Sequence, residues 1–131
     1  MGLGSMEDMI SGVIKDDSGR ESGILRFAVR CDSCGEIWRS EPRRFSMAGV
    51  TAENENKQVI YDAMWEREWQ SARSLAVAEA AKYFSLCPIC KRISCDICFH
   101  VCDTLDMCAS CAKRLEEPCA PLADCALPPT V

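Results

Sequence analysis

Four Cys-x-x-Cys pairs constrain this chain more than any other feature of its sequence. The pairs are Cys31/Cys34, Cys87/Cys90, Cys95/Cys98 and Cys108/Cys111. A Cys-x-x-Cys turn can point both sulfurs at one ion, and two such turns complete the tetrahedral four-thiolate site that Zn²⁺ accepts. The four pairs therefore predict two structural zinc sites, both closed, with no open position of the kind that a catalytic zinc keeps.

Cysteine-rich chains have a second interpretation, the secreted disulfide scaffold. The sequence has 11 cysteines in 131 residues, and the odd number together with the regular two-residue gaps favours metal. Residues 1–8 show neither the basic nor the apolar stretch of a signal peptide, and no apolar run approaches the length of a membrane span. We therefore expect an intracellular, cytoplasmic zinc protein.

Charge bears on the class of partner. The formal net charge is −5, and eight thiolates on two zinc ions would lower it to about −9. An acidic protein repels phosphate backbones, which disfavours nucleic-acid binding. Five arginines lie around the first cysteine pair, together with Trp38: Arg26, Arg30, Arg39, Arg43 and Arg44. They either bind nucleic acid or offset the negative charge of a four-thiolate site, and we prefer the second interpretation.

The predicted fold is a small α+β zinc-binding domain in three parts. Residues 1–22 form a flexible N-terminal arm, residues 23–117 the double-zinc domain, and residues 118–131 a disordered tail rich in Pro and Cys. Residues 23–30 alternate between apolar and other side chains and predict a strand, and residues 36–40 predict a second one. The turn between them would make a zinc-knuckle β-hairpin, in which Gly35 suits a positive φ.

A long amphipathic helix is predicted between the first and second cysteine pairs, at about 54–84, because this stretch has no Pro or Gly. Its broad apolar face comprises Tyr61, Met64, Trp65, Trp69, Ala72, Leu75, Ala76, Ala80 and Tyr83. Val59, Val77 and Phe84 form a second apolar line. We expect Trp65 and Trp69 to anchor the helix on the hairpin. A helix with two apolar sides is wrapped by its domain or shared with a partner, so a homodimer through this helix is one alternative. A short helix at 112–117 would follow the last cysteine pair.

The spacing leaves two ways to combine the pairs. In a sequential arrangement the first pair joins the second and the third joins the fourth, whereas in a cross-brace the first joins the third and the second joins the fourth. Residues 91–94, between the second and third pairs, span about 13 Å as a strand. That length favours placing the two pairs on different ions, but both arrangements stay open.

The order of the pairs resembles FYVE-type cross-brace zinc fingers and, more loosely, RING fingers, which belong with treble-clef and zinc-ribbon domains. The stretch CPICKRISCDIC carries the resemblance, which covers 31–34 and 87–111 but not the helical insert or the tail. It implies that the eight paired cysteines bind two zinc ions. FYVE domains read phosphoinositides with a basic, His-rich run before the third pair, whereas this chain has KRIS there. The segment 87–111 is also similar to the zinc-ribbon ends of uncharacterised bacterial proteins, which implies no activity.

Four further residues carry metal-binding or thiol chemistry. His100 and Cys102 lie between the third and fourth pairs, and either can substitute for a cysteine ligand. Since eight paired thiols are already available, we expect both to be ordinary loop residues. Cys119 and Cys125 could hold a third ion or form a disulfide, but in a Pro-rich tail we expect free thiols.

Catalytic motifs are missing from the sequence: it has no Gly-rich phosphate loop, no metalloprotease helix and no nucleophile elbow. A redox dithiol in CPIC would need a βαβ context that the pattern lacks. We therefore expect no catalytic residues and a non-catalytic adaptor or scaffold that binds another protein. The alternatives are a nucleic-acid-binding zinc ribbon of a transcription or translation accessory, and a RING-like ubiquitin-transfer adaptor.

Overall fold

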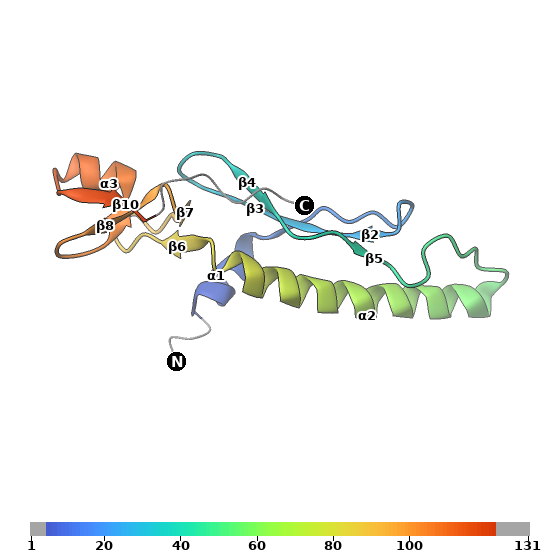
Figure 1. Cartoon of the computed structure of the whole chain (residues 1–131). Coiled ribbons are helices and arrows are strands. Elements are labelled where there is room, and N and C mark those ends of the chain that lie inside the picture. The colour runs from blue at the N-terminus through green and yellow to red at the C-terminus, as the bar shows by residue number, and fades with distance from the viewer. Residues whose placement is uncertain (1–4, 123–131) are drawn as a thin grey trace.

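Short strands and one long helix make up residues 5–122, the part of the chain that the computed structural model describes (Figure 1). The first half contains α1 Ser5–Val13, β1 Lys15–Asp16, β2 Ile24–Leu25, β3 Phe27–Arg30, β4 Ile37–Arg39, β5 Arg43–Arg44 and α2 Glu55–Ala80. The second half contains β6 Phe84–Leu86, β7 Ile93–Cys95, β8 Phe99–Cys102, β9 Met107–Cys108, α3 Ala109–Arg114 and β10 Cys119–Pro121. The molecule is elongated, with β8, β10 and α3 at one end and the start of α2 at the other (Figure 1).

The first hairpin forms where the sequence predicts it. Strands β3 and β4 pair antiparallel with Val29 opposite Trp38, and β1 joins the other edge of β3. The predicted strand over 23–30 is divided, because β2 pairs with β5 and only β3 continues to the cysteine turn. Alternate residues of the hairpin point into the core, where Phe27, Val29 and Trp38 are buried.

Helix α2 lies along this sheet (Figure 1). It begins after Asn54, whose side chain accepts a hydrogen bond from the Lys57 N–H at 2.9 Å, a typical N-cap. The tryptophans anchor the helix as expected: Phe45 lies 5.0 Å from Trp65 and Phe27 lies 5.5 Å from Trp69, between ring centroids. Burial of a phenylalanine side chain stabilises a fold by about 2–3 kcal/mol, so these contacts fix the helix firmly on the sheet.

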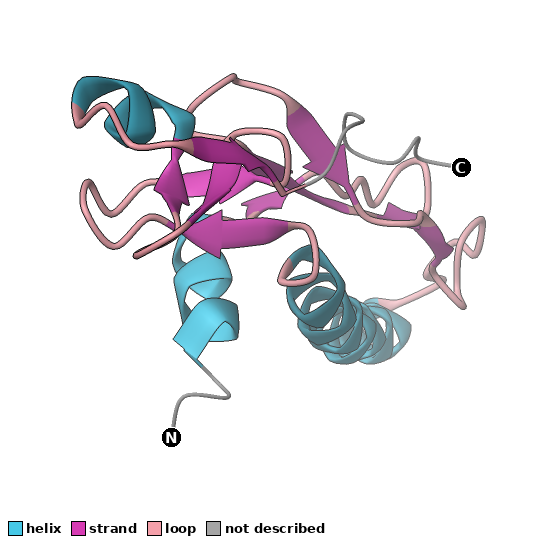
Figure 2. Cartoon of the chain, turned by 60° about the vertical axis from the view of Figure 1, so that its left-hand side comes forward, coloured by secondary structure: helices cyan, strands magenta, loops and turns pink. Residues whose placement is uncertain are grey.

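The predicted apolar face of α2 needs one correction. Leu75 is 52 % exposed, whereas Val77, from the second apolar line, is only 7 % exposed. The reason is that α1 packs against the other side of α2: Ile10 is fully buried, and Arg73 donates a hydrogen bond to the Ser11 carbonyl at 2.8 Å. Figure 2 shows the two helices on the same side of the strands. The C-terminal half of α2 is therefore wrapped by its own domain.

The N-terminal arm also differs from the prediction. Residues 5–16 form α1 and β1 rather than a flexible arm, because Ile10 enters the core and β1 pairs with β3. Farther along, Arg20 lies 5.2 Å from the Trp65 ring centroid and forms a 2.7 Å ion pair with Asp62. Residues 1–4 lie outside the described part of the chain.

The second half of the chain folds around the remaining cysteine pairs. Strands β6 and β7 form a hairpin with Leu86 opposite Ile93, and β8 lies between β10 and β9 in a separate sheet. The short helix predicted at 112–117 begins earlier, at Ala109, with Cys108 as its N-cap residue. The predicted disorder of the tail is wrong for its first residues, because β10 pairs with β8, while residues 123–131 lie outside the described part.

Candidate metal centres

The eight paired cysteines gather in two tetrads, which we name centre 1 and centre 2. Centre 1 consists of Cys31, Cys34, Cys95 and Cys98, and centre 2 of Cys87, Cys90, Cys108 and Cys111. Within each tetrad all four Sγ atoms lie within 4.8 Å of one another, so each can hold a metal ion. The first pair thus joins the third and the second joins the fourth. Of the two arrangements that the spacing leaves open, the structure has the alternating one.

The sulfur atoms are spaced as a tetrahedral metal site requires. The Sγ atoms of Cys34 and Cys95 are 3.9 Å apart in centre 1. In centre 2 the distances are 3.8 Å from Cys87 to Cys111 and 3.7 Å from Cys90 to Cys108. Four sulfurs that each lie 2.3 Å from a common zinc ion at tetrahedral corners are about 3.8 Å apart. The residues present therefore fit one ion per tetrad.

The first two cysteine pairs form the same knuckle turn. Gly35 N–H donates to the Cys31 carbonyl at 3.0 Å, and Lys91 N–H donates to the Cys87 carbonyl at 2.9 Å. Both residues after the second cysteine have a positive φ, 80° for Gly35 and 65° for Lys91. Gly35 could be read from the sequence because glycine favours this conformation, whereas a lysine there gives no such signal. Its position directly after Cys90 is the only clue.

Backbone hydrogen bonds stabilise one thiolate in centre 1. Cys31 Sγ accepts N–H bonds from Ser33 at 3.4 Å, from Cys34 at 3.5 Å and from Cys95 at 3.3 Å. Burial of Cys31 disfavours its ionised form, but these hydrogen bonds outweigh burial and lower its pKa to about 7. Cys31 is therefore more readily ionised than Cys95 and Cys98 of the same centre.

Centre 2 repeats this pattern around Cys87. Burial again opposes ionisation, and N–H bonds from Cys90, Cys108 and Ile89 outweigh it, lowering the pKa of Cys87 to about 6. Burial raises the pKa of Cys95 and Cys98 in centre 1 and that of Cys108, to about 12, in centre 2. Each centre therefore pairs an easily ionised thiol with thiols that a metal ion must deprotonate as it binds.

The two centres are joined through the β6–β7 hairpin. Cys87 directly follows β6 and belongs to centre 2, while Cys95 ends β7 and belongs to centre 1. Asp32, in the first knuckle, donates from its N–H to the Ile93 carbonyl at 2.8 Å and accepts from the Ile93 N–H through Oδ2 at 3.0 Å. Residues 91–94 thus separate the two sites, as their extended length predicts.

Two of the five arginines around the first cysteine pair do not pair with the thiolates as predicted. Arg26 and Arg39 pair with Asp17, at 2.9 and 3.8 Å, rather than with sulfur. Arg114, which the sequence interpretation did not consider, places Nη2 3.6 Å from Cys111 Sγ and offsets thiolate charge there. Trp38 is only 4 % exposed, so its ring is not a free surface for stacking on a base.

A disulfide joins Cys102 to Cys119. This corrects two expectations, because Cys102 is not an ordinary loop residue and Cys119 is not a free thiol. The pairing was missed because it depends on the register of β8 against β10, which places Cys102 opposite Cys119. His100 is half-buried on β8, outside both tetrads, and Cys125 lies outside the described residues.

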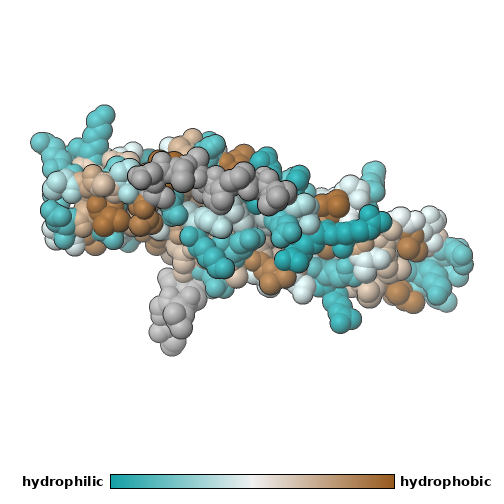
Figure 3. Space-filling model, viewed as in Figure 1, coloured by the Kyte–Doolittle hydropathy of each residue, from teal (hydrophilic) through white to brown (hydrophobic). Residues whose placement is uncertain are grey.

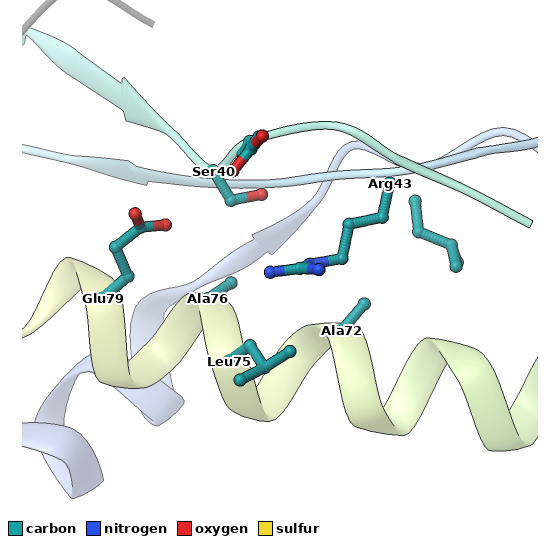
Figure 4. Close-up of a pocket in the computed structure, with 8 residues that line it drawn as sticks. Ser40, Arg43, Ala72, Leu75, Ala76 and Glu79 are labelled. Carbon is teal, nitrogen blue, oxygen red and sulfur yellow. The ribbon is translucent and has the colours of Figure 1, made fainter. Parts of the chain in front are cut away.

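A small cavity lies between the strands and α2. Ser40, Arg43, Ala76 and Glu79 contribute to its wall, and Arg43 reaches toward the helix (Figure 4). Its volume of about 10 Å³ has room for about one water molecule. This cavity is therefore a packing defect and not a binding site for a small molecule.

Comparison with protein-family models, with curated proteins and with solved structures finds no match. Among residues 5–122, none of the helices is both long enough and apolar enough to cross a membrane. The two cysteine tetrads are therefore the features on which the functional interpretation depends.

Within centre 2, Cys87→Ser should weaken zinc binding more than Cys108→Ser at a pH of about 6.5, by at least about tenfold. Zinc must displace a proton from Cys108, whose pKa is about 12, but hardly from Cys87, whose pKa is about 6, so Cys108 contributes less net affinity. Raising the pH reduces the cost of ionising Cys108, so the difference should shrink. Competition with a chromophoric chelator measures both affinities, and equal losses at every pH would contradict the assignment.

Proposed function

We propose that this chain is a non-catalytic protein with two structural zinc ions that acts as an adaptor or scaffold for another protein. The observation that carries the proposal is that each tetrad is complete. Four sulfurs occupy all corners of the tetrahedron, so no position is left for water or substrate, as in structural rather than catalytic zinc sites. Tetrahedral sets of four thiolates are typical of zinc or of iron, and zinc is the ion that adds no redox chemistry.

The alternating pairs support a relationship to cross-brace zinc domains of the FYVE and RING type. In centre 2 a knuckle is followed by the β8–β9 hairpin and by α3, which begins after Cys108 and contains Cys111. This order of knuckle, hairpin and helix supports the proposal of a treble-clef domain. We also propose an intracellular location, because eight cysteines that form no disulfide suit a reducing compartment.

The partner surface that we propose is the N-terminal end of α2. Val59 is 67 % exposed and Ile60 50 %, and Val50, in the preceding loop, is 52 % exposed. Beside them lies a depression of about 330 Å³, lined by Met47, Val50, Thr51, Ala52, Glu53, Lys57 and Tyr61. Figure 3 shows hydrophobic side chains at this end of the molecule, far from the metal centres. Apolar groups gathered in this way are typical of protein interaction sites.

Native mass spectrometry tests the metal assignment. Freshly purified protein should carry two zinc ions and show no visible absorption. The double variant Cys31→Ser, Cys34→Ser should keep one ion, because centre 2 contains neither residue. A coloured, iron-loaded protein would contradict zinc, and a metal-free chain with a native melting temperature would contradict a structural role.

Site-specific photo-crosslinking in cells tests the adaptor role. A photoreactive residue at position 60 should yield one discrete crosslinked partner, whereas the same residue at position 116, on the far end of the molecule, should not. Val59→Lys should abolish the product, and Gln70→Lys, which adds the same charge at another exposed position of α2, should not. No discrete product from position 60 would contradict the proposal, and a dimer of this chain as the sole product would replace the adaptor with a homodimer.

A further inference from the structure

The disulfide between Cys102 and Cys119 closes the sheet beside centre 2. It joins β8 to its edge strand β10, and the two cysteines lie directly opposite in the antiparallel register, with Cα atoms 4.3 Å apart. Both cysteines are partly buried and pack against the core of centre 2, which contains Cys87, Cys108 and Cys111. Neither belongs to a tetrad, so opening the disulfide removes no metal ligand.

Little besides the disulfide holds β10 in place. The strand has three residues, and the side chains of Ala120, Pro121 and the following Leu122 are exposed. Pro121 has no N–H to donate to a ladder. The Leu122 N–H donates to the Phe99 carbonyl at 2.9 Å at the end of the pairing. A short, exposed edge strand of this kind buries too little apolar surface to stay paired without a covalent link.

We propose that Cys102–Cys119 is a redox-responsive latch, which thiol reductants open to release β10 from β8 while both metal centres stay filled. The inference rests on the proposed function in two respects, that both tetrads hold ions and that the protein lies in a reducing compartment. Disulfides in reducing compartments are usually transient and redox-sensing, so one disulfide among the described residues, beside eight cysteines that form none, fits a regulatory bond.

The thiol–disulfide exchange that opens the latch involves no metal-bound sulfur. A reductant thiolate attacks one sulfur of the pair, forming a mixed disulfide and leaving the other cysteine as a thiolate that takes up a proton. A second reductant thiol then attacks the mixed disulfide. Overall, the disulfide and two thiols give Cys102 and Cys119 as thiols and one oxidised reductant disulfide.

Opening the latch changes the surface of the zinc-binding end. When β10 leaves, the N–H and C=O groups of β8 that paired with it face solvent, together with the exposed Val101. Unpaired edges of this kind accept an extended segment of another chain. The latch would thereby control access to the edge of β8.

Hydrogen exchange in glutathione redox buffers tests the latch on the zinc-loaded, full-length chain. On reduction, the amides that bond β10 to β8, such as that of Leu122, which donates to the Phe99 carbonyl, should exchange at least about tenfold faster. The Cys102 amide donates to Asp106 Oδ1 and is not one of them. The amides of Cys95 and Cys108, which donate to Cys31 Sγ and Cys87 Sγ, should keep their protection. Native mass spectrometry should show two added hydrogens and two retained zinc ions. The double variant Cys102→Ser, Cys119→Ser should behave like the reduced protein in every buffer, and Cys125→Ser should respond like the parent chain.

Three results would overturn the latch. They are unchanged exchange at 119–122 on reduction, loss of a zinc ion together with the disulfide, and free Cys102 or Cys119 thiols in the oxidised, zinc-loaded protein. Failure of the proposed function is distinct from these, because it appears as a chain without zinc in the oxidised buffer, before any reductant is added.

Discussion

The convergence of sulfur atoms from distant parts of the chain on two common points is the constraint on which the rest of this structure depends. Cys34 and Cys95 meet although 61 residues separate them, and Cys90 meets Cys108 across 18 residues. The strands that carry them are two to four residues long, too short to be stable by pairing alone. Metal binding would supply what the ladders lack, and it would close the long loop of centre 1 at only a modest additional entropic cost.

The alternating pairs link the two centres through one hairpin. The β6–β7 hairpin provides Cys87 to one centre and Cys95 to the other, although the two centres share no ligand. Helix α2 lies between the first and second pairs in sequence, and its aromatic contacts with Phe27 and Phe45 hold the first hairpin on its surface. The helix thus has two roles: it completes the core, and it extends beyond the core at the end where Val59 and Ile60 are exposed.

Much of the local structure could be predicted from the sequence because it follows from local patterns. The knuckle with Gly35, the first hairpin and the long helix each depend on residues close together in the chain. The pairing of the tetrads, the burial of Val77 in place of Leu75 and the Cys102–Cys119 disulfide depend instead on which distant elements meet. The four-residue spacing at 91–94 favoured alternation, and long-range contacts such as those of Asp32 with Ile93 and of Ser33 with Ser94 hold it in the fold. The helix and strand within residues 5–16 were not predicted from the sequence, because α1 is stabilised by α2, far along the chain.

Cadmium NMR tests the alternating assignment most directly, because a cadmium nucleus couples through sulfur to the β-protons of the cysteines that bind it. Protein loaded with ¹¹³Cd should show two cadmium signals. One should correlate with Cys31, Cys34, Cys95 and Cys98, and the other with Cys87, Cys90, Cys108 and Cys111. A cadmium signal shared by Cys31 and Cys87 would contradict the arrangement, and with it the account of how this chain folds.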